Sequence, residues 1–226
     1  MTNLNACLYL SGRTNVEVDV KSFDELKSIA EKINSASLLW QTFVNQMALN
    51  FWMREYKNVV ELSEKYSEEH PSSQQKHALY VFRTLFEGVA YLNLARQTKL
   101  AKWKILGEKA VTRMSQLESM SKWNFENKSK LLQAELYYVE GNLESAEAFY
   151  KASIKAAHEH KIIHEEALAC ELYGIFCVEN KMADEGLKQL RIALDQYKQW
   201  GAMKKANTLQ LFIDRVDSRA TCGGWN

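Results

Sequence analysis

Histidine and glutamate side chains that could bind a metal ion gather in one short segment of the sequence. The segment contains His158, Glu159, His160, His164, Glu165 and Glu166. Imidazole and carboxylate groups are zinc ligands, but histidines two residues apart point in different directions on a helix. The segment also falls between two helical repeats, where solvated polar residues are common. We therefore expect a solvated turn here, with no metal and no cofactor.

A basic stretch between residues 96 and 113 is a second candidate site. Its cationic side chains are Arg96, Lys99, Lys102, Lys104, Lys109 and Arg113. They could receive an acidic peptide, a phosphate or a nucleic acid. The alternative, which we favour, is a solvated helix face with Trp103, Ile105 and Leu106 turned inward. With 29 Lys and Arg against 28 Asp and Glu, the chain also lacks the basic excess of a nucleic-acid binder.

Catalytic signatures are absent from the sequence. No serine, cysteine or aspartate stands in a recognisable nucleophile motif. A G-x-x-x-x-G-K-[ST] phosphate loop and an H-R-D-type catalytic loop are also missing. We therefore expect a protein that is not an enzyme.

The sequence also predicts a cytoplasmic protein. No apolar run reaches the ~18 residues that cross a bilayer, and Met1–Ser11 lacks the basic and apolar regions of a signal peptide. Cys170 and Cys177 lie about two helical turns apart, roughly 10 Å along the axis, which is too far for a disulfide. We expect both to be buried thiols.

Apolar residues recur at helical spacing along most of the chain, which predicts an all-α fold. One proline and nine glycines are few helix breakers for 226 residues. Ser22 and Glu25 form a capping box, Pro71 marks the clearest break, and Trp123 and Asn124 are expected in a connection. The predicted helices cover residues 22–33, 37–52, 56–66, 75–94 and 99–120.

Small and large residues recur at about 40-residue spacing in the second half of the chain. The first set is Ala134, Tyr137, Gly141, Ala146, Tyr150 and Ser153, and the second is Gly174, Cys177, Lys181, Gly186, Leu190 and Ala193. The pattern resembles the tetratricopeptide repeat, a pair of antiparallel helices. Small residues allow the helices to cross closely, so a bulky side chain at Ala146 or Gly186 would force them apart. Lys181 stands where the turn glycine is expected, and an ordinary helical bundle with coincidental spacing is the alternative.

These patterns predict antiparallel helix hairpins stacked as a tetratricopeptide-like, right-handed α-α solenoid. Residues 1–120 would be degenerate hairpins in the N-terminal part of the array. Residues 121–219 would form two repeat units and a capping helix, and residues 220–226 a flexible tail. Ala6–Leu10 followed by Gly12 reads as a helix end with its glycine stop, as in a piece of a longer protein or a shortened relative.

The inner surface of such an array is lined by the first helix of each unit, which is where we expect a partner to bind. The register predicts eight groove residues: Lys128, Leu131, Glu135 and Tyr138 in the first unit, and Leu168, Glu171, Ile175 and Val178 in the second. A mixed surface of this kind suits a peptide or a neighbouring helix.

Several segments resemble the helical-repeat part of large multidomain signalling proteins. The matching segments are Asn124–Lys128, Gln133–Glu135, Ile163–Ala169 with Glu171 and Leu172, and Trp200–Ala202 with Lys205. In that family the repeats accompany a serine/threonine kinase-like domain, an ATPase module, and a histidine kinase or nucleotide cyclase. The resemblance covers Gln75–Phe212, and Leu8–Trp52 more loosely. Gln199 and Lys204 depart from it, since the family has arginine and a small residue there.

The resemblance implies a non-catalytic scaffold for protein–protein interaction or interdomain coupling in signal transduction. Its expected partner is a protein or peptide, such as an ATPase or kinase-type module, with neither nucleic acid nor a membrane span involved. Two alternatives remain open: a regulatory segment of a larger ATPase, kinase or cyclase enzyme, and a structural subunit of an assembly.

Overall fold

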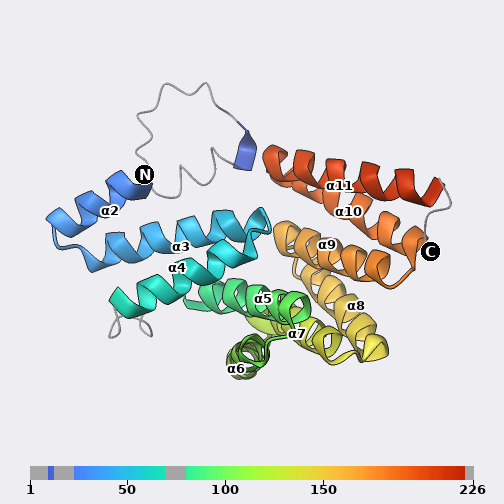
Figure 1. The fold of residues 1–226 in the computed structure, drawn as a ribbon, viewed down its shortest axis with the longest axis horizontal. Coiled ribbons are helices and arrows are strands. Elements are labelled where there is room, and N and C mark those ends of the chain that lie inside the picture. Colours follow the sequence, from blue (N-terminus) through green and yellow to red (C-terminus); the bar gives the residue numbers. More distant parts are fainter. Residues whose placement is uncertain (1–9, 13–22, 70–79, 222–226) are drawn as a thin grey trace. The chain divides into compact units, whose positions relative to one another are not determined.

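A computed structural model describes residues 10–12, 23–69 and 80–221 of the chain. Within these residues the secondary structure is ten α-helices and no strand, which confirms the predicted all-α class. The helices are α2 (Phe23–Lys32), α3 (Ala36–Trp52), α4 (Tyr56–Glu69), α5 (Tyr80–Thr98), α6 (Ala101–Met120), α7 (Lys122–Glu140), α8 (Leu143–Glu159), α9 (Ile163–Glu179), α10 (Ala183–Trp200) and α11 (Met203–Thr221). Figure 1 shows them along the chain.

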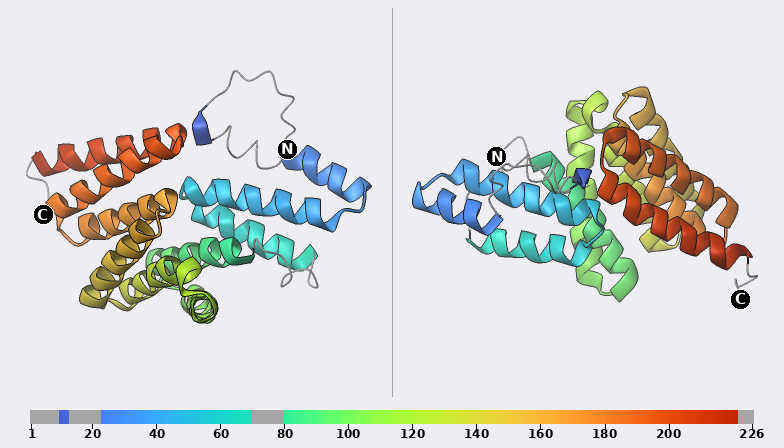
Figure 2. Two further views of the ribbon diagram at one scale, coloured as in Figure 1. Left: turned by 180° about the vertical axis from the view of Figure 1, so that it is seen from behind. Right: turned by 90° about the horizontal axis from the view of Figure 1, so that it is seen from above.

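The chain divides into two compact units, Met1–Met114 and Ser115–Asn226, and the division falls inside α6. In the first unit, α2 packs on α3, α3 on α4, and α4 on α5. In the second unit, each helix from α7 to α11 lies beside the next one in the sequence (Figures 1 and 2). Consecutive helices are therefore neighbours from α2 to α5 and from α7 to α11.

Side chains that accept hydrogen bonds begin two of the helices. The Ser35 hydroxyl accepts from the Leu38 amide at 3.3 Å before α3, and the Asn142 side chain accepts from the Ser145 amide at 3.1 Å before α8. Such caps satisfy amides that have no partner within the helix. The predicted cap at Ser22, the break at Pro71 and most of the predicted tail lie outside the described residues.

Trp123 and Asn124 lie in the first turn of α7, so the predicted connection at these residues is wrong. The chain passes from α6 to α7 at Ser121 alone. At the N-terminal end, Leu10 and Ser11 are helical and Gly12 has a φ of 69°, as expected of a glycine that stops a helix.

Most of the turns between helices share one backbone conformation. Among the turns that the structure describes, every one except that at Ser121 contains one residue whose φ lies between 50° and 86°. These left-handed residues are Asn34, Arg54, Lys99, Gly141, Lys161, Lys181 and Gly201. Only two are glycines, although a left-handed conformation costs other L-residues roughly 1–2 kcal/mol.

Paired backbone hydrogen bonds hold all of these turns except that at Lys99. Around Lys181, the Met182 amide donates to the Cys177 carbonyl at 2.8 Å and the Lys181 amide to the Val178 carbonyl at 3.3 Å. This is the Schellman arrangement, which satisfies the last carbonyls of a helix. The same pair forms around Gly141, with distances of 3.0 and 3.2 Å. Lys181 therefore makes the same turn as the glycine that it replaces in the repeat.

The small residues of the repeat lie where two helices cross closely. A Cβ atom added to Gly186 would lie 2.7 Å from Cγ2 of Val178 and 2.9 Å from the carbonyl oxygen of Gly174. One added to Gly174 would lie 2.7 Å from Cγ of Leu190. Ala146 is fully buried between α7 and α8. The predicted need for a small residue at Gly186 is confirmed.

Aromatic rings fill the interior of the first unit. The rings of Phe43 and Tyr66 stack with centroids 4.1 Å apart, and Trp40 lies 5.1 Å from Tyr66. Further along α3, Phe51 packs against Phe86 of α5 at 4.4 Å. These contacts join α3 to α4 and α5 and fix the position of α3 in the first unit.

Candidate functional site

A surface groove of the first unit follows the open side of α3 between α2 and α4. Three hollows form it, and all three are lined by Gln46. The first and second hollows also share Phe23, and the first and third share Lys65. The lining runs from Leu39 to Met53, about 20 Å at 1.5 Å per residue. We call this feature the α3 groove.

One end of the α3 groove is a cavity of about 110 Å³. Its floor combines apolar side chains from all three helices with the buried Thr42. The apolar lining residues are Phe23, Leu39, Phe43, Leu62 and Tyr66. The Thr42 hydroxyl donates to the Leu38 carbonyl at 2.8 Å, so its polar atom is satisfied within α3. The cavity therefore offers an apolar surface to an entering side chain.

Polar side chains surround this apolar floor. Lys27 and Asp24 of α2 stand on one side, and Lys65 of α4 stands on the other. Gln46 is half-buried, and its amide makes no hydrogen bond within the part of the chain that the structure describes. A half-buried amide of this kind can bond the backbone of a bound chain.

The other end of the α3 groove carries amides and carboxylates. Asn50 and Asn58 face each other across α3 and α4, with Nδ2 of Asn58 3.3 Å from Oδ1 of Asn50. Glu61 lines the same hollow, and Glu55 lines the hollow beside it. Glu61 lies 3.8 Å from Lys57 and shares its hollow with Lys65, so charges of both signs lie along this side of the groove.

The eight groove residues predicted from the repeat register lie in a different place, on α7 and α9 of the second unit. Seven of them are buried: Lys128, Leu131, Glu135, Leu168, Glu171, Ile175 and Val178. Tyr138 is partly exposed, and its hydroxyl donates to Glu179 at 2.6 Å. The charged members bond to side chains of the same unit. A partner-binding groove lined by these eight residues stays a prediction.

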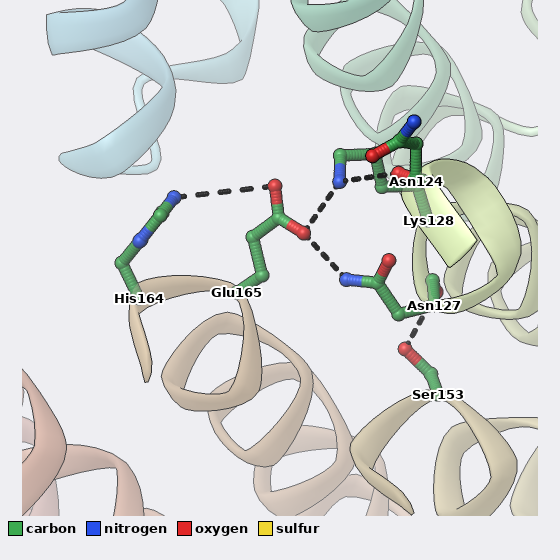
Figure 3. Close-up of polar contacts among 6 residues, drawn as sticks. All are labelled: Asn124, Asn127, Lys128, Ser153, His164 and Glu165. Carbon is green, nitrogen blue, oxygen red and sulfur yellow. Dashed lines mark hydrogen bonds and ion pairs between the residues drawn. The ribbon is translucent and has the colours of Figure 1, made fainter. Parts of the chain in front are cut away.

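Lys128 belongs to a polar cluster that joins α7, α8 and α9 (Figure 3). Its ammonium group and the side-chain amide of Asn127 both donate to one oxygen of Glu165, each at 2.5 Å. The Ser153 hydroxyl donates to the Asn127 carbonyl at 2.8 Å. His164 lies on the other side of the carboxylate, with Nε2 3.9 Å from Glu165. Burial lowers the pKa of His164, which favours the neutral ring.

Glu135 and Glu171 are two further buried carboxylates of the second unit, and their hydrogen-bond partners lie on other helices. The Tyr150 hydroxyl of α8 donates to Glu135 at 2.6 Å. Glu171 of α9 accepts from the Tyr197 hydroxyl of α10 at 2.7 Å and from the Lys205 ammonium of α11 at 2.6 Å. The sequence register predicted that both carboxylates lie on the first helix of a repeat unit, and they do. Their hydrogen-bond partners lie on helices that come later in the chain.

The histidines that suggested a metal site have separate partners. His158 lies 3.1 Å from a Glu166 oxygen, the His160 ring lies 4.0 Å from the Trp123 ring, and His164 faces Glu165. Among the residues that the structure describes, no three histidine, cysteine or acidic side chains are grouped to hold a metal ion.

The basic stretch spans the end of α5, the turn at Lys99 and most of α6. Only some of the residues that were predicted to turn inward do so. Trp103 is buried and stacks on Tyr91 at 6.0 Å. Leu106 is half-buried, whereas Ile105 is 49% exposed, so the prediction that Ile105 turns inward is wrong. The helical spacing of the stretch leaves Ile105 on the same side of α6 as Lys102 and Lys109.

Cys170 and Cys177 are free, buried thiols, as the sequence predicted. Burial raises the pKa of Cys170 to about 12 and the pKa of Cys177 to about 11. Both groups are therefore protonated at neutral pH, and a protonated thiol is a poor nucleophile.

Sequence reasoning missed the α3 groove. Its lining residues do not follow the 40-residue repeat, and no motif joins α2, α3 and α4. The signal that could have found it is the polar series Thr42, Gln46 and Asn50, which marks one face of an otherwise apolar helix at four-residue spacing.

Comparison of the chain with family models, with curated proteins and with solved structures finds no match. In the part of the chain that the structure describes, no helix combines the length and the apolar character that a bilayer crossing requires.

Proposed function

We propose that this chain is a non-catalytic helical scaffold that binds a protein or peptide partner in the α3 groove. The observation that carries the proposal is the groove itself, which follows a whole helix and combines an apolar cavity with a half-buried, unbonded amide at Gln46. A long, shallow surface with mixed chemistry suits an extended or helical segment of another protein.

The arrangement of the helices supports a tetratricopeptide-like, right-handed solenoid. Consecutive helices pack on each other from α2 to α5 and from α7 to α11, most of the described turns share one backbone conformation, and Gly174 and Gly186 allow α9 and α10 to cross closely. Repeat scaffolds of this kind present extended surfaces to partners. The resemblance to helical-repeat segments of signalling proteins supports a cytoplasmic role that couples an ATPase or kinase-type module to an output.

The proposal can be tested with a photo-crosslinking amino acid at Gln46 in the full chain, expressed in its source cells. We expect one discrete protein to be captured, and we expect that protein, purified separately, to bind the wild-type chain but not the Gln46→Arg variant. The matched control is the same photo-crosslinker at Lys109, an exposed position on α6. The proposal fails if both positions capture the same set of proteins, or if Gln46→Arg binds as wild type does.

A structural subunit is a second candidate, and exposed apolar side chains of the second unit favour it. Met120 is 80%, Trp123 62% and Leu211 64% exposed. Apolar groups of this size on a surface can mark contacts with another chain. Sedimentation of the purified chain tests this: association that Trp123→Ser or Leu211→Ser abolishes supports a subunit, and a monomer at micromolar concentration contradicts self-assembly.

A further inference from the structure

We propose that the outward side of α6 docks on an anionic phospholipid surface. Three lysines and two apolar residues around the start of α6 form this side: Lys99, Leu100, Lys102, Ile105 and Lys109. We call it the α6 face. It shares no residue with the α3 groove, so the inference goes beyond the proposed function and does not rest on it.

The three lysines of the α6 face have no acidic partner. Lys99, Lys102 and Lys109 are exposed, and none of them makes an ion pair or a side-chain hydrogen bond within the described residues. The ammonium group of Lys102 lies over the ring of Trp103, 3.8 Å from the ring centroid, and this contact does not neutralise its charge. All three positive charges therefore face the solvent uncompensated.

Acidic residues near the α6 face are already bonded elsewhere. Glu108 is the one acidic residue between positions 88 and 117, and it pairs with Lys104 at 3.4 Å. On α5, which packs on the inner side of α6, Glu87 is buried in an ion pair within the same helix. Glu55 lines a hollow beside the C-terminal end of α5 and accepts a hydrogen bond from a side chain of α4. The α6 face therefore keeps a local positive excess.

Apolar side chains stand between these lysines. Ile105 is 49% exposed and lies one turn after Lys102 and one turn before Lys109, so the three side chains share one side of α6. The two lysines are about 10 Å apart along the helix axis. Leu100 is 51% exposed in the turn that precedes α6, next to Lys99. Cationic and apolar groups therefore alternate along the α6 face.

An anionic bilayer surface offers a partner to both kinds of group. Its headgroups attract the ammonium groups, and the acyl layer just beneath them receives isoleucine and leucine side chains. Lysine stems lie along such a boundary with the charge at the headgroups. The α6 face is also the convex flank of one helix, opposite the side that packs Trp103 and Gly107 on α5, and a convex flank can rest on a flat surface. A nucleic acid would attract the lysines but would offer Ile105 no apolar layer.

Sedimentation of the full chain with lipid vesicles tests the inference. One set of vesicles is phosphatidylcholine alone, and the other contains about one phosphatidylserine in every three lipids. We expect the chain to sediment with the phosphatidylserine vesicles only. Raising the salt from about 0.1 M to about 1 M should release it, because the Debye length falls from about 10 Å to about 3 Å.

Removing charge then assigns the binding to the α6 face. Each lysine near an anionic surface contributes about fivefold to the affinity, so Lys102→Gln with Lys109→Gln should bind about 25-fold more weakly. The matched control is Lys161→Gln with Lys198→Gln, which removes the same charge from two exposed positions of the second unit and should bind as wild type. Ile105→Ser keeps every charge and should weaken vesicle binding about fivefold through the lost apolar contact. Circular dichroism of each variant checks that it is folded as wild type.

Several results would overturn the inference: equal sedimentation with both kinds of vesicle or with neither, wild-type binding by the double variant at Lys102 and Lys109 or by Ile105→Ser, or an equal loss in the control pair. Binding of single-stranded DNA or polyglutamate that needs Lys102 and Lys109, without binding to vesicles, would overturn it in favour of a soluble polyanion. Capture of a partner at Gln46 is a separate measurement, so the proposed function and this inference can fail independently.

Discussion

At the scale of single residues, the second unit contains buried carboxylates that bond to side chains of other helices. Glu171 is 1% exposed and Lys205 2%, and their ion pair spans 2.6 Å between α9 and α11. Tyr197 donates to the second oxygen of Glu171, so both oxygens have partners. Removing one partner from such a pair leaves a charge in a place where water does not reach it.

Replacing Lys205 with methionine should therefore destabilise the chain. Lys205→Met leaves Glu171 charged and buried, and we expect the free energy of unfolding in urea to fall by roughly 3–5 kcal/mol. The double variant Lys205→Met with Glu171→Gln should recover part of this loss, because a neutral amide still accepts from Tyr197. Lys151→Met is the control, since its pair with Glu147 is exposed and worth about 1 kcal/mol or less. Equal losses in Lys205→Met and Lys151→Met would contradict the argument.

His164 should make the stability of the chain depend on pH. Burial lowers its pKa below the ordinary value of 6.5, Lys128 lowers it further, and Glu165 opposes both. The unfolded chain then binds the proton at a higher pH than the folded chain does, so the free energy of unfolding falls as the pH drops below about 6.5. The stabilisation from the neutral ring is fully present above that pH.

Urea unfolding between pH 8 and pH 5 measures this effect. His164→Gln should reduce the fall in the free energy of unfolding at acidic pH, because glutamine does not take up a proton. His158→Gln is the matched control, because His158 is an exposed histidine that lies 3.1 Å from Glu166 on the surface of the same unit. If His158→Gln flattens the profile and His164→Gln does not, the assignment to His164 is wrong.

At the scale of elements, the helices were predictable and several of their turns were not. Helical spacing located α3, α4 and α6 to within a few residues, because one face of each helix must be apolar. Gly141 and Gly201 also indicate their turns in the sequence. Asn34, Arg54, Lys161 and Lys181 do not, since the paired hydrogen bonds of the turn, and not the residue type, impose their left-handed backbone. The turn at Lys99 is left-handed too, and its amide donates to the Ala95 carbonyl.

Glycine at position 181 should therefore stabilise the chain. Lys181 has a φ of 64°, which costs a lysine about 1–2 kcal/mol and a glycine much less. After the greater backbone entropy of glycine in the unfolded chain is subtracted, Lys181→Gly should raise the free energy of unfolding by about 0.5–1 kcal/mol. Lys181→Ala keeps the strained conformation and should change stability little. Thermal or urea unfolding of the two variants distinguishes them, and equal stabilities would refute the role of backbone strain.

At the scale of the whole chain, sequence register predicts a repeat but cannot distinguish the inner surface of such a repeat from its interior. Glu171 was expected to face a partner, and its bonds instead reach Tyr197 and Lys205, which are 26 and 34 residues away. Such pairs become visible only when the helices are placed in space. The α3 groove was missed for the same reason, because α2, α3 and α4 each contribute separate residues to it.

The second unit should fold without the first. Its buried ion pairs and aromatic contacts join helices that all lie after residue 114, including Glu118 with Lys130 at the α6–α7 turn. We expect a fragment of residues 115–226 to be helical by circular dichroism and to unfold cooperatively in urea. Lys205→Met within the fragment should shift its midpoint to lower urea, as in the full chain. A fragment that unfolds without a cooperative transition, or that is insensitive to Lys205→Met, would show that these contacts do not suffice to hold α7–α11 together.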